Sequence, residues 1–340
     1  MDRCNAYKLL RLLAGVGFVY FICFMFGSKN NNKDLTSKTH YKSWRSIGSM
    51  HNLPLVTPLD PYSMKTFPIS DFAVCILTPF APALDSTTWQ LTEKIRRYAG
   101  ETTTVFILSD ALENFEVVEV KTNNVLIVGV DPTITIRHGF QLSDGFNIKK
   151  NVHAWDKFYF LFSKILLGRY KFVFAVEWDV HIPTREAYQA LENSAFLSLT
   201  NFISSNSSFY DLVTPSEWAN HDGHTTRIDS IKKRSTPDWH WQRVKNRPLQ
   251  LPWFGSMMCV HGLSQQLLTK IKDYAALNGR LEFIEIFGIT LAKQNNLTIN
   301  HPPCLSTITF KAQWGCKDIQ QYPKKLFHPV KNSTSLNRCL

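Results

Sequence analysis

Two acidic residues and a histidine directly follow an apolar run in the stretch FVFAVEWDVHIPT, Phe172–Thr184. The run ends at Val176, and Glu177, Asp179 and His181 follow within five positions. Because a single residue separates Asp179 from His181, both side chains can point to one side of an extended chain. A carboxylate oxygen and an imidazole nitrogen together suit a divalent ion such as Mn²⁺. The spacing therefore predicts a metal site where a buried strand ends.

The sequence leaves two points about this site open. Glu177 and Asp179 also have the spacing of a pair of metal ligands, so Glu177 is expected either to bind the metal or to lie beside the substrate that the metal holds. Acids at a strand end can also cap the next helix, which is expected at Arg185–Asn193. Mn²⁺ and Mg²⁺ sites commonly use one or two protein ligands and let substrate phosphates supply the others. A cation held this way neutralises the charge on a departing diphosphate, which is the chemistry of sugar transfer from a nucleotide donor.

Short apolar runs alternate with helical segments through the first half of the chain. The expected strands are Phe72–Leu77, Thr103–Leu108, Val125–Val130 and Phe172–Val176, and the expected helices are Trp89–Tyr98 and Trp155–Leu167. Runs that are apolar throughout and separated by helices are typical of a parallel sheet covered on both faces. We therefore expect an α/β fold with a mostly parallel sheet flanked by helices. Ligands of such sheets bind at the carboxyl ends of the strands, here Thr78, Asp110, Asp131 and the turn at Glu177–His181.

The second half of the chain is less regular. The expected elements are a short strand at Tyr210–Pro215, a strand at Trp253–His261, a helix from Ser264 to Leu277 and a helix at Leu281–Lys293. Ser264 can cap its helix and Gly279 can end it. Residues 220–247 are polar and predict a long loop, and no clear element is expected from His301 onward.

The N-terminus predicts an uncleaved membrane anchor, with a cleaved signal peptide as the alternative. Leu9–Gly27 is apolar apart from Arg11, and it lies at the short end of the roughly 17–25 residues that a membrane helix needs. Basic residues before the span point the N-terminus to the cytosol. We expect a cytoplasmic tail at residues 1–8, a transmembrane signal-anchor at 9–27, a stem at 28–70 and a luminal catalytic domain at 71–340. A short span of this kind is expected in the Golgi or ER membrane.

Composition and cysteine use narrow the class of protein. The chain has 340 residues, of which 44% are hydrophobic, enough for one sizeable core. Its formal net charge is +11, but it contains no nucleic-acid-binding motif, so we expect no nucleic acid partner. The sequence favours a disulfide between Cys304 and Cys316, because both lie in irregular sequence. Acceptor sequons at Asn206, Asn296 and Asn332 predict glycosylation of a luminal domain.

Together these features make the chain similar to type II glycosyltransferases of the secretory pathway that have the GT-A fold. The Asp179-Val180-His181 triplet is similar to the DxD motif of that superfamily, in its DxH variant. The resemblance covers residues 71–331 and implies a Rossmann-like sheet. It also implies an inverting transfer from a nucleotide-sugar, expected to be a UDP-sugar, to a glycan or glycoprotein acceptor, with Mn²⁺ or Mg²⁺ as cofactor.

The resemblance implies roles for residues outside the triplet. Thr78 and Asp110 match positions that hold the nucleotide base and ribose, although either can equally be a turn residue. Gly255 is similar to the small residue beside the donor sugar, where it would allow close approach of the ligand; a packing glycine is the alternative. His328 is similar to the C-terminal histidine that completes the metal shell, with a structural histidine as the alternative. Lys331 would then reach the diphosphate as a point charge.

An inverting transferase also needs a base to take a proton from the acceptor hydroxyl. The stretch EFIEIFGITLA, Glu282–Ala292, resembles the E-x-F-x-P-T-L-A pattern of several such enzymes, with Gly288 and Ile289 departing from it where proline is usual. Glu285 is the first candidate for the base and Glu282 the second. They are one turn apart on the expected helix. A surface glutamate that only supports the helix is the alternative.

The principal alternative function is a non-catalytic luminal protein that binds glycans or holds partner enzymes on a degenerate transferase fold. It would keep the aromatic residues near Trp239 and Trp241 but would need no metal. A luminal hydrolase is disfavoured because the chain has neither a G-x-S-x-G nor an H-E-x-x-H motif.

Overall fold

A computed structural model describes the chain in segments from residue 58 onward. The described residues are 58–59, 70–80, 86–99, 103–112, 116–120, 125–141, 152–197, 208–221, 241–309, 313–330, 336 and 339. The expected tail, anchor and most of the stem lie outside them, as do Asn206, Lys331 and Asn332. Within this described part of the chain, no helix is long and apolar enough to cross a membrane. All the described residues belong to the unit Ile47–Leu340.

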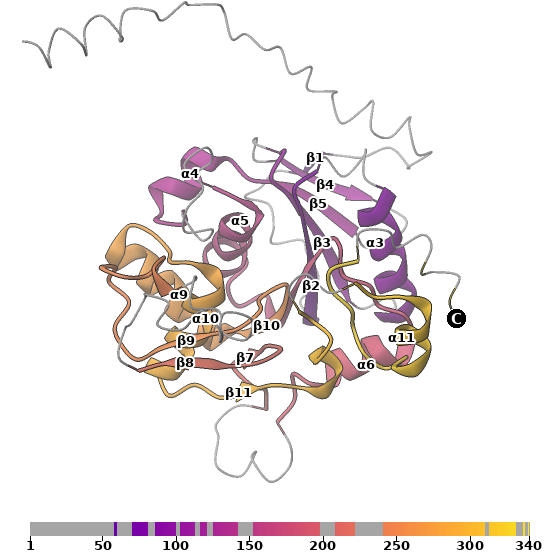
Figure 1. Ribbon diagram of the computed structural model, residues 1–340. Helices are drawn as coiled ribbons and strands as arrows, with labels where there is room; N and C mark the ends of the chain where they lie inside the picture. Colours follow the sequence, from indigo (N-terminus) through magenta and orange to yellow (C-terminus); the bar gives the residue numbers. More distant parts are fainter. Residues whose placement is uncertain are drawn as a thin grey trace, which may run out of the picture. The chain divides into compact units, whose positions relative to one another are not determined.

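Nine of the described strands form one sheet with a parallel centre (Figure 1). In spatial order they are β1 (Pro58–Leu59), β4 (Glu116–Val120), β5 (Val125–Gly129), β3 (Thr104–Ser109), β2 (Ser70–Thr78), β6 (Tyr170–Glu177), β10 (Val260–Ser264), β7 (Leu212–Val213) and β11 (Ile299–Asn300). The strands β5, β3, β2 and β6 run parallel, whereas β4 and β10 flank them in antiparallel pairs. The expected α/β fold is confirmed.

Helices cover both faces of the sheet (Figure 1). One face carries α5 (Ala154–Phe160), its continuation as a π-helix (Leu161–Ile165), α9 (Gln265–Asn278) and α10 (Ile284–Gln294), and the other carries α3 (Ser86–Ala99) and α6 (Arg185–Asn193). The smaller elements are α4 (Pro132–Arg137), a 3-10 helix at Pro303–Leu305, α11 (Cys316–Gln321), and a two-stranded sheet of β8 (Trp218–Asn220) and β9 (Trp253–Gly255).

Burial on both faces explains why the central strands form and why they are rigid. Every residue of β3 and of β5 is buried, as strands between two helical layers require. Phe106 of β3 packs edge-on against Phe162, with ring centroids 5.0 Å apart, and so ties the sheet to the α5 layer. The carboxyl ends of β2, β3 and β6 therefore meet at one fixed edge.

Several elements differ from those expected from the sequence. The 3-10 helix at Pro303–Leu305 and α11 lie after His301, where no clear element is expected. The strand expected at Trp253–His261 is divided into β9 and β10, because residues 256–259 leave the strand conformation. The helix expected from Leu281 begins at Ile284, so Glu282 precedes it. The strand β4, with the sequence EVVEV, is not expected because its acidic residues interrupt the apolar run.

The disulfide joins Cys316 to Cys339, so the expected pairing of Cys304 with Cys316 is wrong. Cys316 begins α11, and its Cα lies 5.0 Å from the Cα of Cys339. Cys304 is instead a free, buried thiol in the 3-10 helix. Cys339 packs in an apolar cluster with Ile319, Phe327, Val330 and Leu336. Because this cluster contains Phe327 and Val330, the disulfide helps to hold the segment around residue 328 against the domain.

Lys157 of α5 is a fully buried cation that joins the helix to the end of β3. It is 0% exposed, and its Nζ donates hydrogen bonds to the carbonyls of Ser109 (2.9 Å), Asp110 (3.2 Å) and Leu112 (2.7 Å). A buried charge is tolerated only where its hydrogen-bonding groups are satisfied. The ammonium group therefore holds the end of β3 beside the start of the helix.

Replacing Lys157 with Met is expected to lower the free energy of unfolding by about 3 kcal/mol or more, because buried carbonyls lose a charged donor. The exposed Lys164 on the same continuous helix is the control, and Lys164→Met is expected to change stability by less than about 0.5 kcal/mol. Urea unfolding followed by circular dichroism measures both. Equal stabilities of the two variants would show that Lys157 does not hold the strand end.

Candidate metal and ligand site

The turn after β6 is held by backbone hydrogen bonds to strands on both sides. Trp178 N donates to the carbonyl of Leu77 in β2 (2.9 Å), and Glu177 N donates to the carbonyl of Cys259 beside β10 (2.8 Å). Val180 N donates to the carbonyl of Glu177 (3.1 Å) and closes the turn. The acidic side chains at 177 and 179 are thereby placed at the carboxyl edge of the parallel strands, where sheets of this class bind ligands.

A C-terminal segment pairs with the chain just after this turn. His181 and Phe327 exchange two backbone hydrogen bonds of 2.9 and 3.0 Å. Val330 N donates to the carbonyl of Asp179 (2.8 Å). His328 lies between these two contacts, so the pairing carries its side chain to the acidic residues.

His328 contacts both acids. Its Nε2 lies 3.2 Å from Oε2 of Glu177 and 3.2 Å from Oδ1 of Asp179. Its Nδ1 lies 3.2 Å from the carbonyl oxygen of Thr309. Because a carbonyl only accepts hydrogen bonds, Nδ1 carries a proton, and Nε2 is the ring nitrogen that faces the carboxylates. The structure thus brings together Glu177, Asp179 and His328, all singled out in the sequence.

The two carboxylates favour a positive charge at this place. Burial alone lowers the pKa of His328, but its contacts with Asp179 and Glu177, together with their negative charges, outweigh burial and raise that pKa to about 10. Oδ1 of Asp179 is buried and has no aligned hydrogen-bond donor, although the imidazole nitrogen is 3.2 Å away. Two carboxylates and an imidazole nitrogen are a donor set that fits a divalent cation.

Cys259 is a fourth candidate ligand, and the sequence analysis does not single it out. A carboxylate oxygen of Glu177, the sulfur of Cys259 and a ring nitrogen of His328 all lie within 4.8 Å of one another. Burial raises the pKa of this thiol well above its usual value, and the charges of Glu177, Glu285 and Asp179 add to the effect. In the sequence, Cys259 is one more apolar position of an expected strand. Only the pairing of β10 with β6 reveals what it faces.

A cavity of about 420 Å³ opens beside these residues at the carboxyl ends of β2, β3 and β6. Trp155 stacks on His261 with ring centroids 5.2 Å apart, and Trp178 packs edge-on against Phe80 at 4.9 Å. Both tryptophans line the cavity, although neither is singled out in the sequence. Cavities of roughly 300–1,000 Å³ are typical of small-molecule sites. The lining residues are Leu77, Thr78, Pro79, Asp110, His153, Ala154, Trp155, Glu177, Trp178 and Asp179.

Thr78 and Asp110 line this cavity and also hold local structure. Asp110 N donates to the carbonyl of Thr78 (3.0 Å), which joins the two strand ends. The carboxylate of Asp110 accepts a hydrogen bond from Ala154 N and lies 3.4 Å from Nδ1 of His153, so it supports the start of α5. The hydroxyl of Thr78 accepts a hydrogen bond from Phe80 N (3.2 Å). Contact of Thr78 and Asp110 with a nucleotide-sugar stays a prediction.

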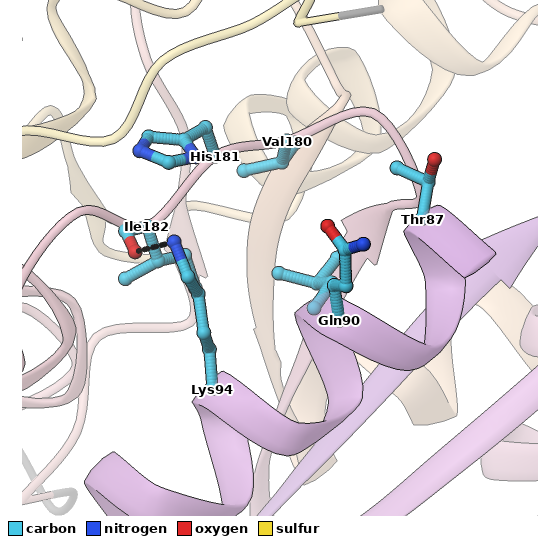
Figure 2. Close-up of a pocket in the computed structure, with 7 residues that line it drawn as sticks. Thr87, Gln90, Lys94, Val180, His181 and Ile182 are labelled. Carbon is cyan, nitrogen blue, oxygen red and sulfur yellow. Dashed lines mark hydrogen bonds between the residues drawn. The ribbon is translucent and has the colours of Figure 1, made fainter. Parts of the chain in front are cut away.

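His181 lines a different pocket (Figure 2) and belongs to no group of candidate metal ligands among the described residues. It is 2% exposed and lines a second, smaller pocket against α3, where Lys94 Nζ donates to the carbonyl of Ile182 (3.4 Å). Burial and the charge of Lys94 lower the pKa of His181 to about 3, so its imidazole is neutral. Because the chain turns at this point, the alternation of a straight strand does not apply, and Asp179 and His181 line different pockets. Metal binding by His181 stays a prediction.

The two candidate bases differ in their surroundings. Glu285 lies in the first turn of α10 and is partly buried, its backbone carbonyl accepts a hydrogen bond from Ser256 N (2.7 Å), and its charge helps to raise the pKa of the Cys259 thiol. Glu282 precedes the helix and is 3% exposed. Its carboxylate accepts a hydrogen bond from the Tyr274 hydroxyl (3.1 Å) and lies 3.6 Å from Nε of Arg280, and burial raises its pKa. Glu282 is thus engaged with partners of its own, and a catalytic role for Glu285 stays a prediction.

Gly255 and Asn296 are described, and neither lines the cavity. A Cβ atom added at Gly255 would lie 3.2 Å from the ring of Trp241 and 3.3 Å from that of Trp218, so packing accounts for a glycine there. A role for Gly255 beside a donor sugar stays a prediction. Asn296 is exposed at φ 54°, a left-handed conformation that asparagine tolerates better than most residues.

Comparisons with known proteins identify no family for this chain. No family model matches the chain. No curated protein matches it either. Among solved structures, the chain is similar to the apo crystal structure of mouse xyloside xylosyltransferase 1, at 12% identity and a TM-score of 0.35, over 78% of this chain and 99% of that one. A likeness at this level does not establish a function.

Proposed function

We propose that this chain is a metal-dependent glycosyltransferase that moves a sugar from a nucleotide-sugar, in our proposal a UDP-sugar, to a glycan or glycoprotein acceptor. The observation that carries the proposal is the contact of His328 Nε2 with Glu177 and Asp179, 3.2 Å from each, beside a cavity at the carboxyl ends of the parallel strands. A cation site next to a ligand-sized cavity is what a nucleotide diphosphate requires.

Glu177, Asp179 and His328 are the residues that would hold Mn²⁺ or Mg²⁺. Their oxygen and nitrogen atoms suit such an ion, which would take the place of the proton that His328 Nε2 holds beside the two carboxylates. A cation bound there supplies charge neutralisation for a diphosphate leaving group. The hydrogen bond of His328 Nδ1 to the carbonyl of Thr309 orients the ring so that Nε2 faces the carboxylates.

The cavity offers different surfaces to the parts of a nucleotide. Trp155 and Trp178 supply aromatic rings that can stack on a planar base or on a sugar ring. Thr78 and Asp110 line the same cavity and supply hydrogen-bonding groups for the base and the ribose. Lys331, which is outside the described residues, is proposed to reach the diphosphate.

Glu285 is proposed as the base that takes the proton of the acceptor hydroxyl. It is partly buried and near enough to Cys259 for its charge to act on the thiol. The proton would move from the acceptor oxygen to the carboxylate as that oxygen bonds to the sugar carbon. Attack from the face opposite the leaving group inverts the configuration, so we propose an inverting reaction.

The proposed compartment is the lumen of the ER or Golgi, with the N-terminal segment as the anchor. The Cys316–Cys339 disulfide is consistent with an oxidising compartment. The exposed Asn296, which begins an Asn-Leu-Thr sequon, is open to glycosylation there.

The test is whether Mn²⁺ and UDP stabilise the full-length protein together. Ligands that bind only the folded state stabilise it by about 2.7 kcal/mol at a hundredfold excess over Kd. We expect a small rise in Tm with either ligand alone and, with both, a rise larger than the sum. His328→Gln is expected to lose this excess, because the set of ligands is incomplete. Hydrolysis of a panel of nucleotide-sugars by the same protein would then identify the donor.

Two outcomes would contradict the proposal. One is a rise in Tm with both ligands that only equals the sum of the rises with Mn²⁺ and with UDP alone. The other is a rise in Tm of His328→Gln that still exceeds this sum. Stabilisation by glycans without any effect of Mn²⁺ or UDP would instead support the non-catalytic glycan-binding protein.

A further inference from the structure

A thiol lies inside the acidic site. In the antiparallel register of β10 with β6, Val260 pairs with Val176, and extending this register by one residue sets Cys259 opposite Glu177. The hydrogen bond from Glu177 N to the carbonyl of Cys259 (2.8 Å) holds the two residues in this pairing. Cys259 is 8% exposed and is therefore buried.

The three donor atoms are close enough together to bind one ion. The sulfur of Cys259, an oxygen of Glu177 and a nitrogen of His328 all lie within 4.8 Å of one another. Protein ligands bind Zn²⁺ tetrahedrally at about 2.0–2.3 Å, so two ligand atoms of one ion lie about 3.3–3.8 Å apart. Side-chain rotation that brings the three atoms from within 4.8 Å to this spacing would let all three reach the same ion.

The chemistry of this set differs from that of an oxygen-only site. Mg²⁺ and Ca²⁺ prefer carboxylate, carbonyl and water oxygens. A thiolate combined with imidazole and carboxylate instead suits Zn²⁺ and Co²⁺. The other described free thiols, Cys75 and Cys304, belong to no such group of candidate ligands among the described residues.

We propose that Cys259 is a fourth metal ligand beside Glu177, Asp179 and His328, and that its sulfur makes this site bind Zn²⁺ and Co²⁺, as well as the Mn²⁺ of the proposed function, more tightly than Mg²⁺. This inference deepens the proposed function. It depends on the proposed function for one point only, which is that a cation binds at this edge of the sheet. On binding, the thiol releases its proton to solvent and its sulfur bonds to the ion.

Titration of the full-length protein with Co²⁺ tests this. Thiolate bound to Co²⁺ produces a sulfur-to-metal charge-transfer band in the near ultraviolet, which oxygen and nitrogen ligands do not. We expect this band to saturate at one equivalent of Co²⁺ and to disappear when Zn²⁺ displaces it. In Cys259→Ser the band is lost, and Zn²⁺ affinity falls by more than the ~10- to 100-fold typical of losing a hydrogen-bond partner of a ligand. Cys304→Ser alters another buried free thiol and is the matched control. It is expected to keep the charge-transfer band and the Zn²⁺ affinity.

Equilibrium dialysis of the same samples separates the outcomes. Bound Co²⁺ without the charge-transfer band, or a band that survives in Cys259→Ser, overturns the role of Cys259 but leaves a cation site of oxygen and nitrogen ligands. Protein that binds no Co²⁺ overturns both this inference and the metal part of the proposed function. Should Cys259→Ser fail to fold, X-ray absorption of the zinc-loaded natural protein decides. A sulfur neighbour at about 2.3 Å supports the inference, and oxygen and nitrogen neighbours alone overturn it.

Discussion

Replacing Asp179 with Asn is expected to reduce sugar transfer by about 10²- to 10³-fold, the effect of removing one preorganised electrostatic contact from an active site. Asn keeps the size of the side chain but removes its charge, next to an imidazole that lies 3.2 Å away. The site would then hold a cation less tightly, and the charge on a departing diphosphate would be less well neutralised. Initial rates with the identified nucleotide-sugar at saturating Mn²⁺ measure the effect, and thermal unfolding confirms that the variant is folded.

Asp211 supplies a matched control. It is also buried, at 5% exposed, and it accepts hydrogen bonds from the Ser264 hydroxyl (2.7 Å), from Thr298 N (2.9 Å) and from the Thr298 hydroxyl (2.9 Å). Asp211→Asn should therefore lower stability, because three donors lose a charged acceptor, while the folded fraction keeps its turnover. Full activity of Asp179→Asn at saturating metal and donor would contradict the assignment of Asp179 to the metal.

Replacing Glu285 with Gln is expected to lower kcat by about 10²- to 10⁴-fold and to leave donor binding unchanged. Glutamine has nearly the same shape but cannot take a proton from the acceptor hydroxyl. Donor affinity is expected to stay the same because Glu285 does not line the cavity assigned to the nucleotide. Steady-state kinetics with varied acceptor, together with calorimetric titration of the donor nucleotide, separate the two effects.

Glu282→Gln is the comparison that makes this result specific. The carboxylate of Glu282 is engaged with Tyr274 and Arg280, 3.1 and 3.6 Å away. We expect this variant to change stability and to keep most of its kcat. Equal losses of kcat in the two variants would mean that neither glutamate is the base and that both act by supporting α10.

The central sheet was predictable from the sequence because burial on both faces leaves a local pattern. The expected run Phe72–Leu77 lies within β2, and the expected runs at 103–108, 125–130 and 172–176 match β3, β5 and β6 to within a few residues. A strand between two helical layers must be apolar at every position, whatever the rest of the chain does. The placement of Glu177 and Asp179 at a strand end followed from the same pattern.

The disulfide was not predictable in this way. Cys304, Cys316 and Cys339 all lie in irregular sequence near the C-terminus, and nothing local distinguishes the correct pair. The choice depended on which sulfur atoms the fold brings close, and α11 with its apolar cluster places Cys316 beside Cys339.

By itself the sequence determined the α/β class of this protein and the position of its acidic residues at a strand end, because both depend on neighbours along the chain. The tertiary structure decided which residues share the site. The turn after β6 sends Asp179 to the large cavity and His181 to the smaller pocket, the pairing at Phe327 brings His328 to the carboxylates, and the β10–β6 register places Cys259 opposite Glu177. These contacts join segments far apart in sequence, and their hydrogen bonds form only when the whole sheet is assembled.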